Sequence, residues 1–291
     1  RTPSSMRTVP RWNAVPGGVG GLLHLRDVEQ GLENFKRLPT VDAGIDIAAA
    51  ADFPGSAPAR PGDSDLVVSW HQPSPLRMGL SADDSGNRST GRYQGAATLS
   101  VDHALALNDL LYLTLQRDLG GGESGARGTR GHALHYSLPL GYWLLAANQG
   151  ASRYHQSVAG ASQDYVYSGT SRNADVRVAR TVWRDAVRKT QVSWRGWQRA
   201  SSNFIDDTEV EVQRRRTAGW DLGLHHVEGL GRSELEADLT WRRGTGARHA
   251  LPAPEDAFGE GASRVRLTQL ETHWAYPWRA GNHALRYDLR W

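Results

Sequence analysis

The chain has no cysteine, and lysine is nearly absent, with Lys36 and Lys189 the only two among 291 residues. Without cysteine the chain forms no disulfide and offers neither a thiolate nucleophile nor a cysteine-ligated zinc site. The cationic residues are therefore nearly all arginine. They are interleaved with acids along the whole chain, whereas a nucleic-acid-binding protein gathers its basic residues in one stripe. These absences exclude thiol chemistry and argue against nucleic acid as a partner.

Long hydrophobic runs are also absent. Hydrophobic residues make up 39% of the chain, and no stretch approaches the ~20 continuous apolar residues that a membrane-spanning helix needs. A membrane β-barrel passes this test, because its strands turn only every second side chain toward lipid. Composition therefore excludes a helical membrane protein and leaves a soluble protein and a barrel open.

The first part of the chain has a helical period followed by two strand-like segments. Residues 1–16 form a linker or remnant. Beyond them, apolar residues from Leu25 to Phe35 recur at helical spacing, and Pro39 ends the helix. Val41–Ile47 and Asp65–Trp70 alternate as strands. We therefore expect a small α/β unit over residues 17–72.

From Leu76 onward the apolar residues recur with a period of two. About eleven such segments follow, each close to the ~9 to 11 residues of a tilted transmembrane strand. Short turns are expected at residues 140–142, 184–189 and 277–282, and long loops at 120–130, 150–171 and 244–263, an asymmetry typical of barrels. Residues 73–291 thus predict a mainly β fold, an antiparallel transmembrane β-barrel. Because single-chain barrels close with an even number of strands, eleven strands imply an incomplete one.

The charged residues of these strands lie on one face of the alternation, which we expect to face the lumen of the barrel. The predicted lumen-facing residues are Arg77, Asp83, Asp102, Glu236, Asp238, Arg286, Asp288 and Arg290. Aromatic rings flank the expected short turns and predict a girdle at the membrane interface. The girdle residues are Tyr142, Trp143, Trp183, Trp274, Tyr276 and Trp278.

Several clusters resemble chemical sites, and none of them predicts one. His132 and His135 are three residues apart, which puts them on opposite faces of a strand. The neighbouring acids of Asp83–Asp84 and of Asp206–Asp207 diverge for the same reason. Arg214–Arg216 is either a contact for anionic lipid or lipopolysaccharide, or a solvated loop flank, and the flank is favoured. We expect no catalytic residue, no metal and no cofactor.

Eleven short segments, taken in order, carry a family resemblance. They are Leu25–Asn34, Arg37–Pro39, Ala82–Gly86, Ser89–Gly95, Asp109–Tyr112, Tyr154–Gln156, Ile205–Asp207, Val212–Arg215, Thr217–Trp220, Arg243–Gly246 and Ala253–Gly261. With these segments the chain resembles the outer-membrane transporters of two-partner secretion, the haemolysin and filamentous-haemagglutinin secretion/activation proteins. The resemblance runs from about residue 17 to the end of the chain, and its specificity lies in the order and spacing of the segments.

The resemblance implies a transporter that secretes and activates a large partner exoprotein, such as a haemolysin, an adhesin or a contact-dependent toxin. Members of the family have a plug helix, two periplasmic POTRA (polypeptide-transport-associated) domains and a barrel of about sixteen strands. Residues 17–72 would be part of the second POTRA domain. The first POTRA domain, the plug helix and the Val-Arg-Gly-Tyr or Val-Arg-Gly-Phe loop motif have no counterpart in the sequence, which predicts a fragment.

The same resemblance implies the surroundings of the protein. We expect an outer-membrane location with the N-terminal part in the periplasm, contact with membrane lipid and lipopolysaccharide, and a monomer. The unfolded client would add to an open strand edge of the POTRA unit, at Val41–Ile47 or Asp65–Trp70. Two alternatives remain. A passive porin has no need of the helical unit, and a soluble all-β binding protein needs no alternation of loop length and no aromatic belt.

Overall fold

The computed structural model describes residues 11–18, 20–51, 59–259, 264–280 and 283–290. The chain divides into two compact units. The first contains residues 1–77 together with two short segments from farther along the chain, 100–111 and 137–144. The second contains residues 78–99, 112–136 and 145–291.

The first unit holds one helix and a two-stranded sheet. Helix α1 is Leu25–Lys36, and the strands are β1 (Asp42–Ala49) and β2 (Ser64–His71). Asp27 in the first turn and Lys36 in the last oppose the helix dipole favourably. The strands pair antiparallel from Asp42 opposite His71 to Ala49 opposite Ser64. The predicted helix and both predicted strands are confirmed.

The core of the first unit forms where α1 packs against β1. Its buried residues are Ala14, Phe35, Leu38, Val41 and Ala43. Two turns between strands of the larger sheet belong to this unit as well. The amide of Asn34 donates to the carbonyl of Gly141 over 2.8 Å, and the Tyr142 hydroxyl donates to Asp27 over 2.6 Å. The Asn34 amide and the Tyr142 hydroxyl thus tie the turn at residues 141–142 to the helix.

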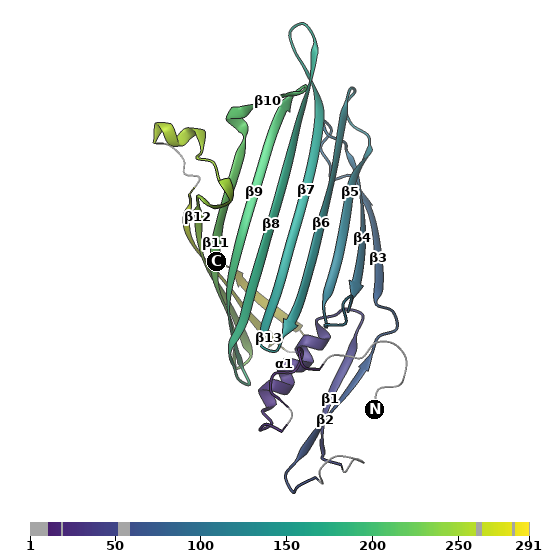
Figure 1. The fold of residues 1–291 in the computed structure, drawn as a ribbon, viewed down its shortest axis with the longest axis vertical. Coiled ribbons are helices and arrows are strands. Elements are labelled where there is room, and N and C mark those ends of the chain that lie inside the picture. Colours follow the sequence, from purple (N-terminus) through teal and green to yellow (C-terminus); the bar gives the residue numbers. More distant parts are fainter. Residues whose placement is uncertain (1–10, 19, 52–58, 260–263, 281–282, 291) are drawn as a thin grey trace. The chain divides into compact units, whose positions relative to one another are not determined.

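The remaining strands form one antiparallel sheet (Figure 1). They are β3 (Leu76–Asp83), β4 (Tyr93–Asp102), β5 (Leu110–Gly120), β6 (Arg127–Leu140), β7 (Trp143–Ala159), β8 (Asp164–Arg184), β9 (Arg188–Ile205), β11 (Arg215–Leu230), β12 (Ser233–Thr245), β13 (Arg266–Ala280) and β14 (His283–Arg290). Each pairs with the next in sequence, and the two-residue β10 (Thr208–Glu209) pairs only with β9. The expectation of about eleven strands is confirmed, and among the described residues the sheet does not close on itself.

The connections match the predicted asymmetry only in part, because the six residues between β5 and β6, where a long loop was predicted, are fewer than the seven between β4 and β5. Strand β6 joins β7 through two residues, and β11 joins β12 through two. The long segment between β12 and β13 carries two 3-10 helices, Ala247–His249 and Pro254–Phe258. The predicted loop over residues 150–171 is wrong, because β7 runs for 17 residues and β8 for 21, leaving only four residues between them. Residues 281–282 of the third predicted turn lie outside the described residues.

The two faces of the sheet differ in polarity. Strand β3 exposes 54% of Leu76, 70% of Met78 and 71% of Leu80, and large apolar side chains are also exposed, to a smaller extent, on β9, β11 and β12. No helix in the described ranges is long and apolar enough to span a bilayer.

Candidate functional site

One face of the sheet is lined by polar side chains that contact one another from strand to strand. Thr98 on β4 shares a hydrogen bond of 2.9 Å with Thr114 on β5. Farther along, His135 on β6 bonds Asn148 on β7 over 2.7 Å, and the Asn148 amide donates to Asp175 on β8 over 2.9 Å. Because side chains in direct cross-strand contact share a face, these contacts define a continuous polar face.

Strand register places the predicted lumen-facing residues on this polar face. Asp238 pairs with His225 of β11 and Glu271 of β13. On β14, Arg290 pairs with His273, which pairs in turn with Glu236. Asp288 follows from Arg290 by alternation, as Asp83 follows from Arg77 on β3. The side chain of Arg286 lies outside those that the structure describes.

The centre of the polar face holds a buried acid that sequence reasoning missed. Asp221 on β11 is 6% exposed. The Arg242 guanidinium donates to both of its carboxylate oxygens, Nε to Oδ1 over 3.0 Å and Nη2 to Oδ2 over 3.1 Å. Trp197 donates its indole N–H over 2.8 Å, and Arg195 lies 3.7 Å away, bridging to Asp175. Four adjacent strands are thereby joined by charge-assisted bonds.

A second polar cluster lies toward the end of the sheet. His225 Nδ1 is 2.9 Å from Asp238 Oδ1 and 3.9 Å from Glu236 Oε1. On the other side, His273 contacts Glu236 at 3.7 Å and Asp288 at 3.0 Å. Within the part of the chain that the structure describes, His225, Glu236 and Asp238 are the group whose ligand atoms lie close enough, within 4.8 Å, to hold an ion. Three predicted lumen residues thus meet two histidines.

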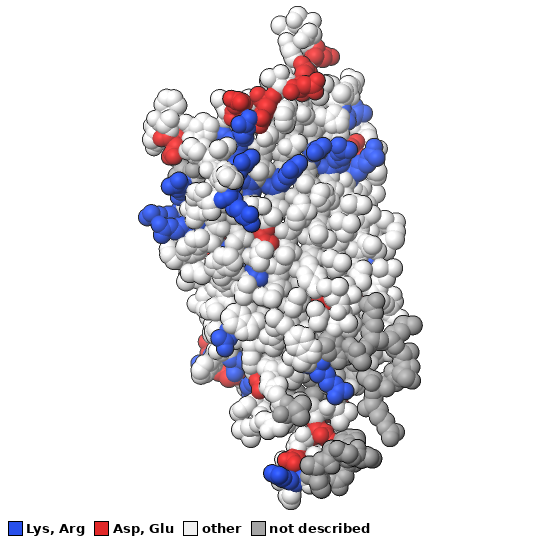
Figure 2. Space-filling model, in the orientation of Figure 1, with Lys and Arg blue, Asp and Glu red and all other residues white. Residues whose placement is uncertain are grey.

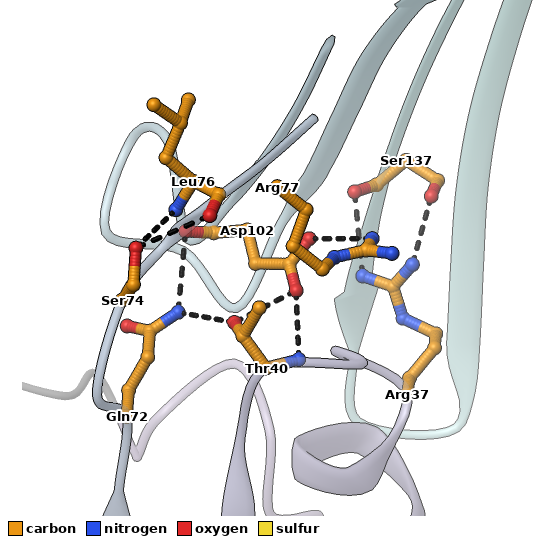
Figure 3. Close-up of polar contacts among 8 residues, drawn as sticks. All are labelled: Arg37, Thr40, Gln72, Ser74, Leu76, Arg77, Asp102 and Ser137. Carbon is orange, nitrogen blue, oxygen red and sulfur yellow. Dashed lines mark hydrogen bonds and ion pairs between the residues drawn. The ribbon is translucent and has the colours of Figure 1, made fainter. Parts of the chain in front are cut away.

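Asp102 is the predicted lumen residue with the least access to solvent. It is fully buried in the first unit, and its Oδ2 accepts the backbone N–H of Thr40 over 2.9 Å and the Thr40 hydroxyl over 2.8 Å (Figure 3). Arg77 bonds Oδ1 over 3.2 Å, and the amide of Gln72 donates to Thr40 Oγ1. This carboxylate therefore joins the segment after α1 to the start of β3 and the end of β4.

Arg37 makes a parallel connection beside it. Its guanidinium donates to the Ser137 hydroxyl over 2.8 Å (Figure 3). It also donates to the carbonyl of Asn108 over 2.7 Å. Asn108 N–H donates to the ring of His103 over 3.1 Å, and both residues are buried. The end of α1 is therefore fixed to the turn between β4 and β5.

The sequence argues against the His132/His135 pair, the acidic pairs and Arg214–Arg216 as chemical sites, and the contacts of these residues agree with that interpretation. His132 bonds Gln149 and His135 bonds Asn148, so the two histidines lie on opposite faces. Asp206 caps the N–H of Val166 over 2.9 Å in a turn. The favoured interpretation of Arg214–Arg216 also gains support, because two of the three arginines are paired with acids of the loops. Arg214 binds Glu209 at 2.6 Å and Arg215 binds Glu255 at 2.9 Å.

Comparison with known proteins identifies relatives over nearly the whole chain. The family of haemolysin secretion/activation proteins ShlB/FhaC/HecB matches residues 62–291, and the POTRA domain matches residues 4–49. The outer membrane transporter CdiB-2 of Burkholderia pseudomallei (strain 1026b) is 30% identical over 274 residues, which are 94% of this chain and 45% of that protein.

Two solved structures share the fold. CdiB from Acinetobacter baumannii superposes with a TM-score of 0.78 at 26% identity, over 99% of this chain and 50% of that one. CdiB from Escherichia coli gives a TM-score of 0.81 at 23% identity, over 91% of this chain and 48% of that one, a likeness of fold alone. The chain spans about half the length of these relatives.

Proposed function

Because this chain belongs to the family of haemolysin secretion/activation proteins ShlB/FhaC/HecB, we propose that it is part of an outer-membrane transporter for a large partner exoprotein. Relatives carry the names outer membrane transporter and hemolysin transporter protein, which are not names of enzymes. The transporter lies in the outer membrane and acts as a monomer by two-partner secretion. We place residues 17–72 in a periplasmic POTRA domain and residues 73–291 in the barrel, with no catalytic role.

The separation of an apolar face from a polar face is the observation that carries this proposal. Leu80 and Met78 on β3, Val176 on β8 and Leu270 on β13 each expose half or more of their surface. Soluble monomers rarely expose contiguous apolar areas beyond a few hundred Å². A sheet with one such face needs lipid against it, while its polar face supports a wet interior.

The polar face is suited to an extended polypeptide in transit. It carries charges of both signs, with Arg77 and Asp83 on β3, Glu236 and Asp238 on β12, and Asp288 and Arg290 on β14. Mixed charges solvate the backbone and side chains of a passing chain without holding either sign tightly. Asp102 is buried against Thr40 and Arg77, so we assign it to fixing the fold and leave it out of the path.

The two-stranded sheet of the first unit offers the client a place to bind. Strands β1 and β2 pair with each other, and among the described residues neither has a second partner. An unfolded chain that adds as a third strand gains backbone hydrogen bonds with little demand on its sequence. This mode of binding suits a transporter that must accept a long segment before it folds.

A passive porin is the second candidate, and the POTRA match over residues 4–49 counts against it. A solute channel needs no strand edge for a polypeptide. A soluble all-β protein is disfavoured by the exposed apolar face described above. Gel mobility separates the latter from a barrel, because a folded barrel runs faster unheated than boiled.

Proline substitution in β1 tests the client site in the intact transporter. Asp46 and Ile47 are adjacent and exposed, and successive backbone N–H groups of a strand point to opposite edges. One of Asp46→Pro and Ile47→Pro therefore removes an N–H from the open edge, and the other removes one from the ladder with β2. An equivalent pair, Leu66→Pro and Val67→Pro, tests β2.

We expect one open-edge variant to reduce the amount of secreted partner at least ten-fold while the heat-modifiable barrel band stays at its normal level. The ladder variant of the same pair controls for loss of the first unit's fold. If both open-edge variants secrete normally with the barrel assembled, the strand-addition mechanism is wrong.

A further inference from the structure

Four arginines on consecutive strands border the apolar face near one end of the sheet. They are Arg117 on β5, Arg130 on β6, Arg153 on β7 and Arg172 on β8, and all four are exposed. Each arginine lies an odd number of positions from a polar-face residue of its own strand, so it lies on the opposite, apolar face. Those polar-face residues are Thr114, His135, Asn148 and Asp175. Figure 2 shows basic residues gathered in a band near the loops, beside a largely uncharged area.

The arginines line two adjoining hollows on this face. One of about 620 Å³ is lined by Arg117, Arg130 and Arg153, with His155 and Thr170 among its other walls. The second, of about 450 Å³, is lined by Arg130, Arg153 and Arg172 together with Leu115. Because Arg130 and Arg153 belong to both, the hollows form one basic groove across β5 to β8.

These arginines are available for a ligand. In the ranges that the structure describes, no salt bridge joins any of the four to an acid, whereas Arg214 and Arg215 are paired with Glu209 and Glu255. The nearest acid of the groove, Asp118, accepts the backbone N–H of Thr129 over 2.9 Å on the polar side. Four like charges at neighbouring positions repel one another unless an anion lies among them.

We propose that this groove binds the phosphorylated headgroup of an anionic glycolipid in the outer leaflet, an inference that rests on the proposed membrane function. Guanidinium groups pair with phosphate oxygens in a bidentate fashion. Beside the groove the same face exposes 53% of Leu115, 40% of Leu134 and 52% of Val176, which suit acyl chains. A free phosphate ion would use the arginines and leave this apolar border uncovered, so the amphipathic ligand fits better.

Binding to the intact protein in detergent, followed by native mass spectrometry, tests the proposal. The variant is Arg130→Gln/Arg153→Gln/Arg172→Gln. The matched control, Arg177→Gln/Arg199→Gln/Arg290→Gln, removes three arginines from the polar face on β8, β9 and β14, and none of the three lines either hollow. The probes are bisphosphorylated lipid A, lipid A without phosphates, and inorganic phosphate.

We expect the variant to bind bisphosphorylated lipid A about 100-fold more weakly than the control, at roughly a factor of five per arginine near a charged lipid surface. Lipid A without phosphates should bind weakly to every form. Equal affinity of the variant and the control, or equal affinity for the two lipids, would overturn the proposal, as would saturable binding of inorganic phosphate at the same arginines. Protein that inserts into bilayers yet shows no lipid preference refutes only this inference, whereas protein that fails to insert refutes the membrane function beneath it.

Discussion

Removing the Arg242 guanidinium tests how much the contacts of the buried Asp221 contribute to the free energy of unfolding. In Arg242→Gln the Asp221 carboxylate loses two bonds, of 3.0 and 3.1 Å, and keeps the Trp197 indole and a more distant Arg195 at 3.7 Å. Breaking a buried ion pair by removing one partner costs about 3 to 5 kcal/mol. The Arg242 side chain is 30% exposed and Arg195 remains, so we expect a smaller cost than this range, about 2 to 3 kcal/mol.

The assay is equilibrium unfolding in urea of the protein refolded into lipid vesicles, followed by tryptophan fluorescence. The matched control is Arg177→Gln, which removes an arginine of the same face whose contact is a bond of 3.3 Å to Ser193. That change should stay within about 0.5 kcal/mol. Asp221→Asn combined with Arg242→Gln completes a double-mutant cycle, in which we expect the double variant to lose about 2 kcal/mol less than the sum of the single variants.

The reasoning is refuted if Arg242→Gln costs no more than the Arg177→Gln control. It is also refuted if the two single effects add to within about 0.5 kcal/mol, the range found for independent sites.

Two further predictions concern acids outside this network. Asp102→Ala removes the acceptor of both Thr40 donors and should lower the free energy of unfolding by about 1 to 3 kcal/mol, measured by circular dichroism of the helix in urea. The control Asp84→Ala breaks an exposed pair with Arg92, and its effect on the free energy of unfolding should stay within about 0.5 kcal/mol. Equal effects of the two changes would show that the Asp102 contacts contribute nothing. The bonds from Arg214 lower the pKa of Glu209 from 4.5 to about 2, with smaller contributions from Ser202 and the Arg214 charge. These bonds therefore stabilise the loop fully above pH 4.5, and this stabilisation is lost as pH falls toward 2. Amide exchange at residues 206–214 of the native protein should rise between these two pH values. Glu209→Gln should abolish this pH dependence of amide exchange. If the variant shows the same pH profile as the native protein, the assignment to Glu209 is wrong.

Much of the fold could be predicted because its signals are local. The helical spacing of Val28 and Phe35 predicts that one face of α1 is buried, and both side chains are buried. The period of two predicts the strands of the sheet because each side chain's direction follows from its neighbours. The length of β7 and β8 could not be predicted this way, because polar segments such as Tyr154–Gln156 are typical of loops. Only the structure shows that this segment is part of β7 and that Tyr154 bonds Asn203 on β9.

The candidate site was predicted only in part, because contacts between strands depend on register. Alternation alone assigned Asp102 to the lumen, and its burial against Thr40 follows from packing 62 residues away along the chain. The pairing of Asp221 with Arg242 has a signal in the sequence that was missed. Both residues lie equally far from the two-residue turn between Leu230 and Ser233, so a tight hairpin there places them opposite each other.

The most direct test of the central claim is a scan of single cysteines along β12, from Leu235 to Trp241, with the protein in lipid bilayers. The chain has no cysteine of its own, so each introduced thiol is the only one in this sequence. We predict that cysteines at Glu236, Asp238 and Thr240 react with a water-soluble maleimide. A fluorophore attached at Leu235, Ala237, Leu239 or Trp241 should instead be quenched by brominated lipid. Labelling without a period of two, or quenching at no position, would contradict the membrane barrel and the export function built on it.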